Sequence, residues 1–383
     1  MRQRLLDILK RETYGEIYRG HYYAPASEDF DSDSDSKSKS EIIRVWRDSA
    51  EISQTKKYID LSSLSEKYSS GNEQILTYFL DGSRRIIKAG EIAYGNSRNT
   101  RTVYPVMAGQ IGVGYCKRVD KKLIPEKIYH EIVIALPDIA DPEGKNNGFI
   151  ESIALKLSQS DLMQRLNLEV AKILKYSASS KTSSLQDKAT AVIQSRMLEL
   201  EQKLTEDLTR HRKLGQNNFL VKDGSLEYMN IKKSCNLNYR WVIGISKSFN
   251  PEICVNPQGK SDSGYIADIP VNHRTPVARF TMPQSMGASE FAVWYIRLYD
   301  RSRTASAFEG VIKVEKMLIT DSERNNGLES DFIDTLSAYI LNERNPVCYG
   351  KDKRWASHIY PVYLTESYIK SRYISTESFI NLF

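Results

Sequence analysis

The sequence YFLDGSRR at residues 78–85 is the stretch that decides the fold. Its apolar run of aromatic and aliphatic side chains ends at Asp81, and Asp-Gly-Ser is typical of a turn. The pattern therefore predicts a buried strand followed by a turn. FLVKDGSL at residues 219–226 repeats the arrangement and ends at Asp223. Either motif alone is ordinary turn chemistry. Together they place two carboxylates at the carboxyl ends of strands, where open α/β sheets gather ligands.

Further strands and helices are expected around these two motifs. Strand patterns occur at 86–94, 101–116, 131–136, 241–246, 291–299 and 311–319. Helical patterns occur at 151–213, with a serine-rich break at 177–184, and again at 330–342 and 362–372. This order of strands and helices predicts an α/β fold with a mixed β-sheet flanked by helices.

The first 70 residues differ in character from the rest. They begin with a short amphipathic helix and include SEDFDSDSDSKSKSE at 27–41, a polar low-complexity tract that cannot bury apolar surface. We expect this tract to be a flexible surface loop. The chain is therefore divided into an N-terminal helix with the acidic-serine tract, 1–70, and a main domain, 71–383.

Composition limits the classes of protein that fit. The chain has 54 Lys+Arg and 48 Asp+Glu, a formal net charge of +6, which permits an anionic partner such as DNA. Its four cysteines form no metal-ligand spacing and are expected as free thiols in a reducing compartment. No apolar run approaches the length that spans a bilayer. We expect a cytoplasmic protein that does not enter a membrane.

The helix between the two aspartates carries acids near its apolar face. One apolar stripe is formed by Ile193, Met197, Leu200, Leu204 and Leu208. At 100° per residue, Glu201 lies about 60° from the centre of this stripe and Glu199 about 140° away. We therefore expect Glu201 to face the sheet and Glu199 to face water.

This order of acids predicts a metal site. A strand with Asp, a helix with an acid, a second strand with Asp and a C-terminal helix follow one another as in a ribonuclease-H-like active site. Three converging carboxylates would repel one another without a cation between them, and hard oxygen ligands suit Mg²⁺ or Mn²⁺. Such ions generate hydroxide and neutralise the leaving oxygen in phosphodiester hydrolysis.

The same motifs resemble the NurA family of nucleases over roughly residues 75–372. The resemblance rests on DGSRR, RMLELEQKL, DGSL, VIGISK, WYIRL and YPVYL, of which the two DGS motifs are the most specific. It implies a dimeric Mn²⁺- or Mg²⁺-dependent nuclease acting on single- and double-stranded DNA. Its implied role is double-strand break end resection and repair with the hexameric translocase HerA. Asp81, Glu201 and Asp223 match the family's metal-binding acids, and Lys247 matches a basic residue near the scissile phosphate.

The sequence departs from the family near its C-terminus. The family usually has a histidine or aspartate a few residues after the YP-x-x-L segment, and this chain has Tyr368 there. Glu366 lies two positions earlier, and His358 precedes the segment. We expect Glu366 to be the fourth metal-site group, with Tyr368 and His358 as the alternatives.

Basic residues beside the first motif are candidates for DNA contact. Arg84 and Arg85 directly follow the Asp-Gly-Ser triplet, and cationic side chains that neutralise phosphates dominate affinity for DNA. A solvated, charge-balanced face is an equally good interpretation of any single arginine.

Two further functions remain open beside the nuclease. The chain could be a non-catalytic nucleic-acid-binding or assembly subunit of the same fold. A more distant possibility is an Argonaute-PIWI-like or transposase-like protein, since fold alone does not determine function.

Overall fold

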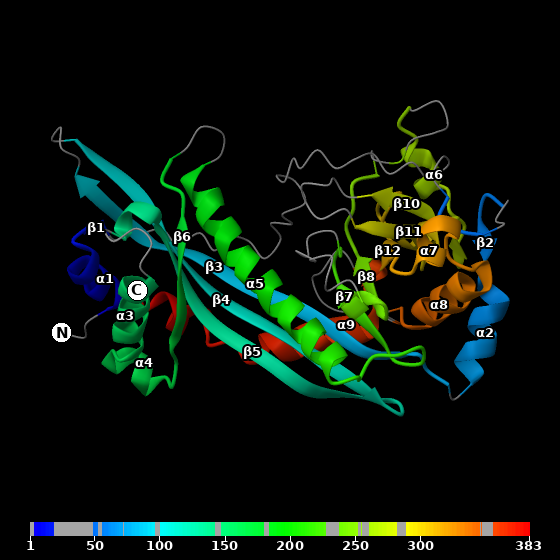
Figure 1. The fold of residues 1–383 in the computed structure, drawn as a ribbon, viewed down its shortest axis with the longest axis horizontal. Helices are drawn as coiled ribbons and strands as arrows, with labels where there is room; N and C mark the ends of the chain where they lie inside the picture. Colours follow the sequence, from blue (N-terminus) through cyan, green and yellow to red (C-terminus); the bar gives the residue numbers. More distant parts are fainter. Residues whose placement is uncertain are drawn as a thin grey trace.

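The protein is elongated, with three long strands joining two lobes (Figure 1). This computed structural model describes residues 4–18, 49–52, 56–71, 73–95, 100–141, 147–179, 184–226, 237–251, 254, 260–281, 289–344, 346 and 355–383. The polar tract at 27–41 lies outside the described residues. Within those residues, no helix is both long and apolar enough to cross a membrane.

The long strands are β3 (Leu76–Gly95), β4 (Arg101–Val119) and β5 (Lys122–Pro137), each antiparallel to the next. The shorter strands are β1 (Glu16–Tyr18), β2 (Ile59–Asp60), β6 (Val170–Tyr176), β7 (Phe219–Asp223), β8 (Val242–Ser246), β9 (His273–Arg274), β10 (Ala278–Thr281), β11 (Glu290–Arg297) and β12 (Val311–Met317). Over the described residues these twelve strands form one sheet, ordered β2-β9-β11-β12-β8-β7-β3-β4-β5-β6, with β1 beside β3 and β10 beside β11.

The sheet is mixed, because β3 is parallel to β7, β7 to β8 and β5 to β6, whereas the remaining pairs are antiparallel. The helices are α1 (Leu5–Thr13), α2 (Ser62–Ser70), α3 (Asn147–Ser158), α4 (Asp161–Arg165), α5 (Leu185–Arg210), α6 (Ser263–Ala267), α7 (Asp321–Asn326), α8 (Ser330–Asn342), α9 (Tyr360–Lys370) and α10 (Thr376–Ile380). The predicted mixed sheet flanked by helices is confirmed.

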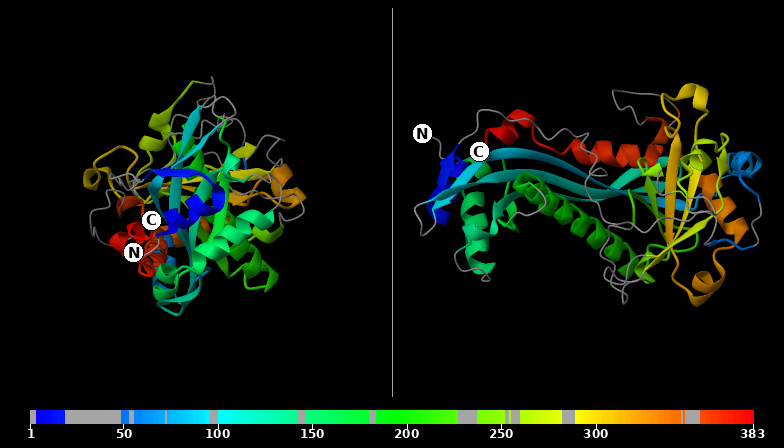
Figure 2. Two further views of the ribbon diagram at one scale, coloured as in Figure 1. Left: turned by 90° about the vertical axis from the view of Figure 1, so that its left-hand side faces the viewer. Right: turned by 90° about the horizontal axis from the view of Figure 1, so that it is seen from above.

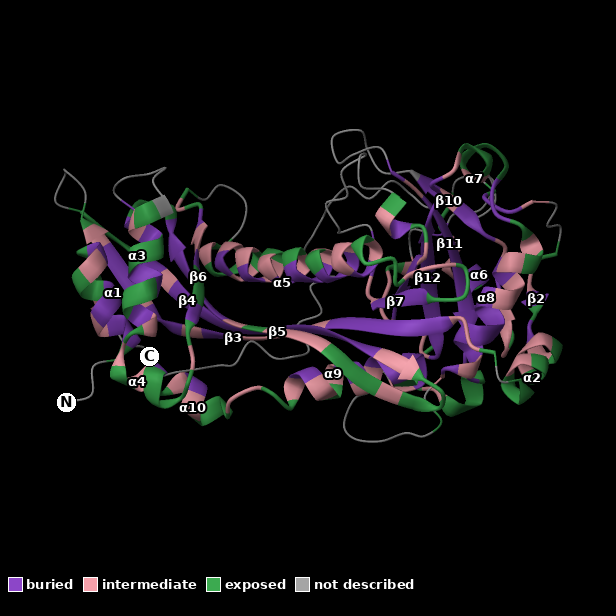
Figure 3. Ribbon diagram, turned by 60° about the horizontal axis from the view of Figure 1, so that its bottom comes forward, coloured by how far each residue is buried: buried purple, intermediate pink, exposed green. Residues whose placement is uncertain are grey.

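Two helices cover opposite faces of the long strands. Helix α5 packs on one face and α9 on the other, as the view from above shows (Figure 2). The predicted apolar stripe of α5 is buried against the sheet, which confirms its orientation. The strands lie between these helices as a largely buried layer (Figure 3). The two faces of β3 therefore meet different partners.

A separate apolar cluster closes the end of the molecule where both termini lie. Leu5 and Leu9 of α1 pack in one cluster with Phe379 and Phe383, all with no exposed surface. The backbone N–H of Leu5 donates to the carbonyl of Leu382 at 3.0 Å. The two chain ends thus stabilise one another, although about 370 residues separate them.

Two predicted elements differ from the structure. The turn expected after Asp81 is absent from β3, which continues through Asp81, Gly82 and Ser83 because these residues pair with Gly114, Val113 and Gly112 of β4. The helical pattern from 151 is also interrupted, because residues 170–176 pair in parallel with β5 and form strand β6. In both places pairing across the sheet overrides the local pattern.

Candidate functional site

Asp81 lies within β3, near the point where a neighbouring strand ends. Strand β7 runs parallel to β3 with Leu80 opposite Lys222, and it stops one residue later at Asp223. Asp223 is therefore at a strand end, as predicted, whereas Asp81 is not. The two aspartates follow paired positions on adjacent parallel strands, so their side chains emerge on the same face of the sheet.

The Asp81 carboxylate is buried and incompletely satisfied. Asp81 is only 4% exposed. Oδ1 accepts a hydrogen bond of 2.7 Å from the backbone N–H of Gly82. Oδ2 is buried and has no hydrogen-bond partner among the described residues. A buried carboxylate oxygen without a partner carries a large desolvation cost, so this atom is a candidate ligand for a cation.

Lys247 brings Asp223 and Glu366 together on this face. It directly follows β8, and its Nζ lies 2.9 Å from Asp223 Oδ2 and 3.9 Å from Glu366 Oε2. Glu366 comes from α9, where Lys370 one turn later pairs with its other oxygen at 3.1 Å. Two strands, one helix and one loop thus contribute Asp81, Asp223, Glu366 and Lys247, which we call the α9-face cluster.

The charges of the α9-face cluster shift its pKa values in opposite directions. Burial raises the pKa of Asp81 well above its ordinary value, and the negative charges of Asp223 and Glu366 raise it further. Burial would also raise the pKa of Asp223, but Lys247 outweighs it and the net shift is downward. Burial would lower the pKa of Lys247, but the surrounding carboxylates raise it. Asp81 is the acid whose charge is least compensated.

Glu201 lies on the other face of the sheet. A Cβ at Gly82 would meet Glu201 and Met197 of α5, so the α5 face of β3 is the one that Gly82 presents. Because side chains alternate along a strand, Asp81 points to the opposite face. Glu201 was expected to converge with Asp81 and Asp223. Instead, Glu201 lies on the α5 face of the sheet, whereas Asp81 and Asp223 lie on the α9 face. Glu199 is 58% exposed and pairs with Arg196, so the predicted difference between the two helix acids is confirmed.

Lys222 is the partner of Glu201, and sequence reasoning missed it. Its Nζ lies 2.8 Å from Glu201 Oε2 and donates to the backbone carbonyl of Asp223 at 2.7 Å. At 2.8 Å the ammonium of Lys222 and the carboxylate of Glu201 form a charge-assisted hydrogen bond. Burial raises the pKa of Glu201, and Lys222 opposes this shift. A lysine inside the apolar run FLVKD was the available signal, because lysine is rarely buried without a partner.

The candidates at the C-terminus have separate surroundings. Tyr368 accepts a hydrogen bond of 3.1 Å from Arg372. The buried His358 ring packs edge-on against Tyr363, and its charge is among those that lower the pKa of Asp223. Of the three predicted alternatives, Glu366 is the one that shares an ion-paired lysine with Asp223.

The two arginines expected to contact DNA diverge. Arg85 donates to the carbonyl of Ile374 at 2.8 Å, and its guanidinium lies over the ring of Tyr373, 5.3 Å from the centroid. Arg85 therefore contacts the C-terminal segment. Arg84 points to the α5 face, where its charge opposes the burial that raises the pKa of Glu201.

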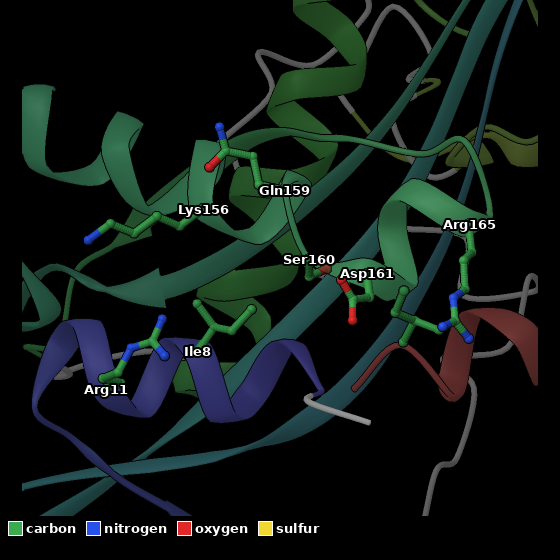
Figure 4. A pocket seen from close by; sticks show the side chains of 8 residues that line it. Ile8, Arg11, Lys156, Gln159, Ser160, Asp161 and Arg165 are labelled. Carbon is green, nitrogen blue, oxygen red and sulfur yellow. The ribbon is translucent and has the colours of Figure 1, made fainter. Parts of the chain in front are cut away.

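The described residues contain no completed metal site. No three side chains of His, Cys, Asp or Glu among them lie close enough to hold one ion. A hollow of about 290 Å³ lies elsewhere, between α1 and the α3–α4 segment, where Arg11, Lys156 and Asp161 line it (Figure 4). It includes none of the predicted site residues.

Comparisons with known proteins give structural similarity only at a distance. No protein-family model and no curated protein matches the sequence. Among solved structures, the NurA nuclease from Sulfolobus solfataricus aligns over 84% of this chain and 88% of that chain, with 11% identity and a TM-score of 0.39. At these values the relationship is too distant to carry a functional argument, so the function is inferred from the geometry and charges of the site.

Proposed function

We propose that this protein is a divalent-metal-dependent DNA nuclease whose metal site is built on Asp81, Asp223 and Glu366. The observation that carries the proposal is the buried Oδ2 of Asp81, which has no hydrogen-bond partner within the described residues. Burial and the neighbouring carboxylates raise the pKa of this acid. A bound cation is the usual compensation for such a group.

The charge of the buried groups supports a divalent cation. On the α9 face, Asp81, Asp223 and Glu366 carry three negative charges when ionised, whereas Lys247 and Lys370 carry two positive ones, which leaves one negative charge. If Lys247 moves away, two negative charges remain for one Mg²⁺ or Mn²⁺ ion to balance. All the donors are carboxylate oxygens, which suit these hard ions better than zinc.

The α9-face cluster would hold the ion only after its acids draw closer and Lys247 moves, since no three acids of the described residues lie close enough to hold one ion in this structure. Its ammonium stands between Asp223 and Glu366, so a metal and this lysine compete for the same oxygens. The bound ion would supply Lewis-acid stabilisation and a nucleophile from water. Glu201 would contribute through Lys222, which contacts the backbone of Asp223. The ribonuclease-H-like description of this site remains part of the proposal.

DNA, the HerA-type translocase and homodimerisation are proposed from the sequence resemblance. The net charge of +6 is compatible with DNA, whereas Arg84 lies on the α5 face of β3, away from the α9-face cluster. The proposed process is end resection at double-strand breaks, in which a translocase would supply the energy of ATP.

Cleavage of end-labelled linear DNA tests the function directly. The purified protein is incubated with Mn²⁺, Mg²⁺ or EDTA beside Asp81→Asn, which keeps the shape but removes the charge. We expect metal-dependent cleavage that falls at least 100-fold in the variant, since 100-fold corresponds to about 2.7 kcal/mol of transition-state stabilisation. Asp268→Asn, at an exposed pair with Arg301, is the matched control and should cleave normally.

The non-catalytic alternative is favoured by one observation, the position of Lys247 among the acids. A lysine that permanently replaces the metal would leave a folded protein that binds DNA but neither binds Mn²⁺ nor cleaves. That combination in the wild-type protein would reject the nuclease in favour of a nucleic-acid-binding subunit.

A further inference from the structure

The turn that follows β7 is held by a buried carboxylate from another strand. Asp223 ends β7, and Gly224 continues with φ +83°, a left-handed conformation that favours glycine. The backbone N–H of Gly224 donates to the carbonyl of Ile245 at 2.8 Å. The chain then turns across β8 towards β12.

Glu315 of β12 receives this turn. It is 3% exposed and lies opposite Gly244 of β8. The hydroxyl of Ser225 donates to both Glu315 oxygens at 2.9 and 2.8 Å, and the backbone N–H of Leu226 donates to Oε2 at 2.7 Å. Lys313 pairs with Oε1 at 2.6 Å. One carboxylate therefore fixes two consecutive residues after Asp223.

Gly244 makes this crossing possible. A Cβ at this position would lie 2.9 Å from the carbonyl oxygen of Gly224 and 2.9 Å from Leu226 Cγ. The turn therefore rests directly on the backbone of β8. The turn is restricted by its close contact with the backbone at Gly244 and by the hydrogen bonds that Ser225 and Leu226 donate to Glu315.

We propose that Glu315 is a positioning residue, which holds the Asp223–Leu226 turn and thereby the Asp223 carboxylate in its place beside Asp81 and Lys247. Glu315 does not belong to the α9-face cluster, because its register opposite Gly244 and Lys222 places it on the α5 face. It acts through Ser225 and Leu226.

The chemistry requires a carboxylate rather than an amide. Among the described residues, Glu315 is contacted by three donors, namely a hydroxyl, a backbone N–H and an ammonium. A carboxylate only accepts, whereas a glutamine would turn an NH₂ group towards at least one of these donors. Lys313 also keeps Glu315 ionised, since it outweighs the effect of burial and the pKa of Glu315 is lowered.

The test measures metal affinity and therefore rests on the proposed function. Mn²⁺ is titrated calorimetrically into the wild-type protein, Glu315→Gln and Ser225→Ala. Residues that orient metal ligands by hydrogen bonds typically change affinity roughly 10- to 100-fold when replaced. We expect the Kd for Mn²⁺ to rise by about that factor in Glu315→Gln and by a smaller factor in Ser225→Ala. Ser225→Ala also keeps the proposal testable if Glu315→Gln fails to fold.

Glu323→Gln is the matched control. Glu323 is another partly buried acceptor near β12, paired with Lys316 at 3.1 Å and bonded to the backbone N–H groups of Ile319 and Thr320. It should lose stability while its Mn²⁺ affinity stays within about twofold of wild type. Wild-type affinity in both Glu315→Gln and Ser225→Ala, or an equal loss in Glu323→Gln, would overturn the positioning role.

Hydrogen–deuterium exchange separates this proposal from the nuclease itself. If the wild-type protein binds no Mn²⁺, the proposed function fails, and the exchange rates of residues 223–226 decide the role of Glu315. Exchange at least tenfold faster in Glu315→Gln, but not in Glu323→Gln, supports the positioning role of Glu315. Unchanged exchange overturns it.

Discussion

Replacing Gly82 by alanine tests how closely α5 and β3 approach. An added Cβ would lie well under 3.0 Å from Glu201 Oε1 and 3.1 Å from Met197 Cγ. The carboxylate is the end of a side chain, but its ion pair with Lys222 and its burial leave it no open space. Either the helix or the ion pair must move.

The size of the effect follows from two contributions. Overpacking a buried site costs about 1–3 kcal/mol. Loss of a buried ion pair costs about 3–5 kcal/mol when one partner is removed, which is an upper limit for a displaced pair. We therefore expect Gly82→Ala to lower the free energy of unfolding by more than overpacking alone would.

Two other glycines provide matched controls. At Gly109, an added Cβ would lie 2.7 Å from Ile193 Cγ2, a contact with α5 that involves no charge. At Gly95, at the other end of β3, nothing lies within 4 Å. Gly109→Ala should cost about 1–3 kcal/mol and Gly95→Ala should stay within about 0.5 kcal/mol of wild type.

Urea unfolding followed by circular dichroism measures the three variants. Gly82→Ala should exceed Gly109→Ala by at least about 1 kcal/mol, and this excess should disappear in a Glu201→Ala background, as a double-mutant cycle would show. Equal costs for Gly82→Ala and Gly109→Ala, or an excess that persists without Glu201, would refute the inference that Gly82 exists to admit this carboxylate.

Three further predictions concern stability in EDTA. The pKa of Asp81 is higher in the folded protein than in the unfolded chain, so the free energy of unfolding falls as pH rises from 3.8 towards the raised pKa. Asp81→Asn removes this loss and should melt higher than wild type at neutral pH. A lower melting temperature contradicts this. Lys247→Met leaves the partly buried Asp223 without its closest cation and should cost, in urea unfolding, less than the roughly 3–5 kcal/mol of a fully buried pair, whereas no loss would show that the pair is dispensable. Phe383→Ala should cost about 3–5 kcal/mol in the same assay, against a near-neutral change for the exposed Asn381→Ala. Equal effects of the last two would argue against C-terminal packing.

The two Asp-Gly-Ser triplets show why a local pattern predicts one site and fails at another. After Asp223 the triplet forms the expected turn, with Gly224 in the left-handed region. After Asp81 the same three residues remain in a strand, because β4 pairs with them. The glycine there serves the approach of α5 instead. Asp-Gly-Ser allows a turn, but pairing with β4 decides whether the turn forms.

Helix periodicity predicted burial reliably but not the face of the sheet. The stripe of α5 correctly separated buried Glu201 from exposed Glu199. Whether Glu201 would join Asp81 depended on which side of β3 the helix covers. That choice is made by the connection of α5 through β6 and β7, and a single helix sequence contains no information about it.

Glu366 illustrates the opposite case, an acid whose place depends on residues far from it. Helix α9 is seated on β4 at Gly112, where a Cβ would lie 2.5 Å from Ile369 Cγ2. The chain beyond α9 is anchored at the far end of the molecule, where Phe379 and Phe383 pack with Leu5. Gly112 in β4 and the apolar packing between the two ends of the chain therefore fix the position of the Glu366 carboxylate. Because these contacts link three distant parts of the sequence, the acid opposite Lys247 emerges only when the whole chain is folded.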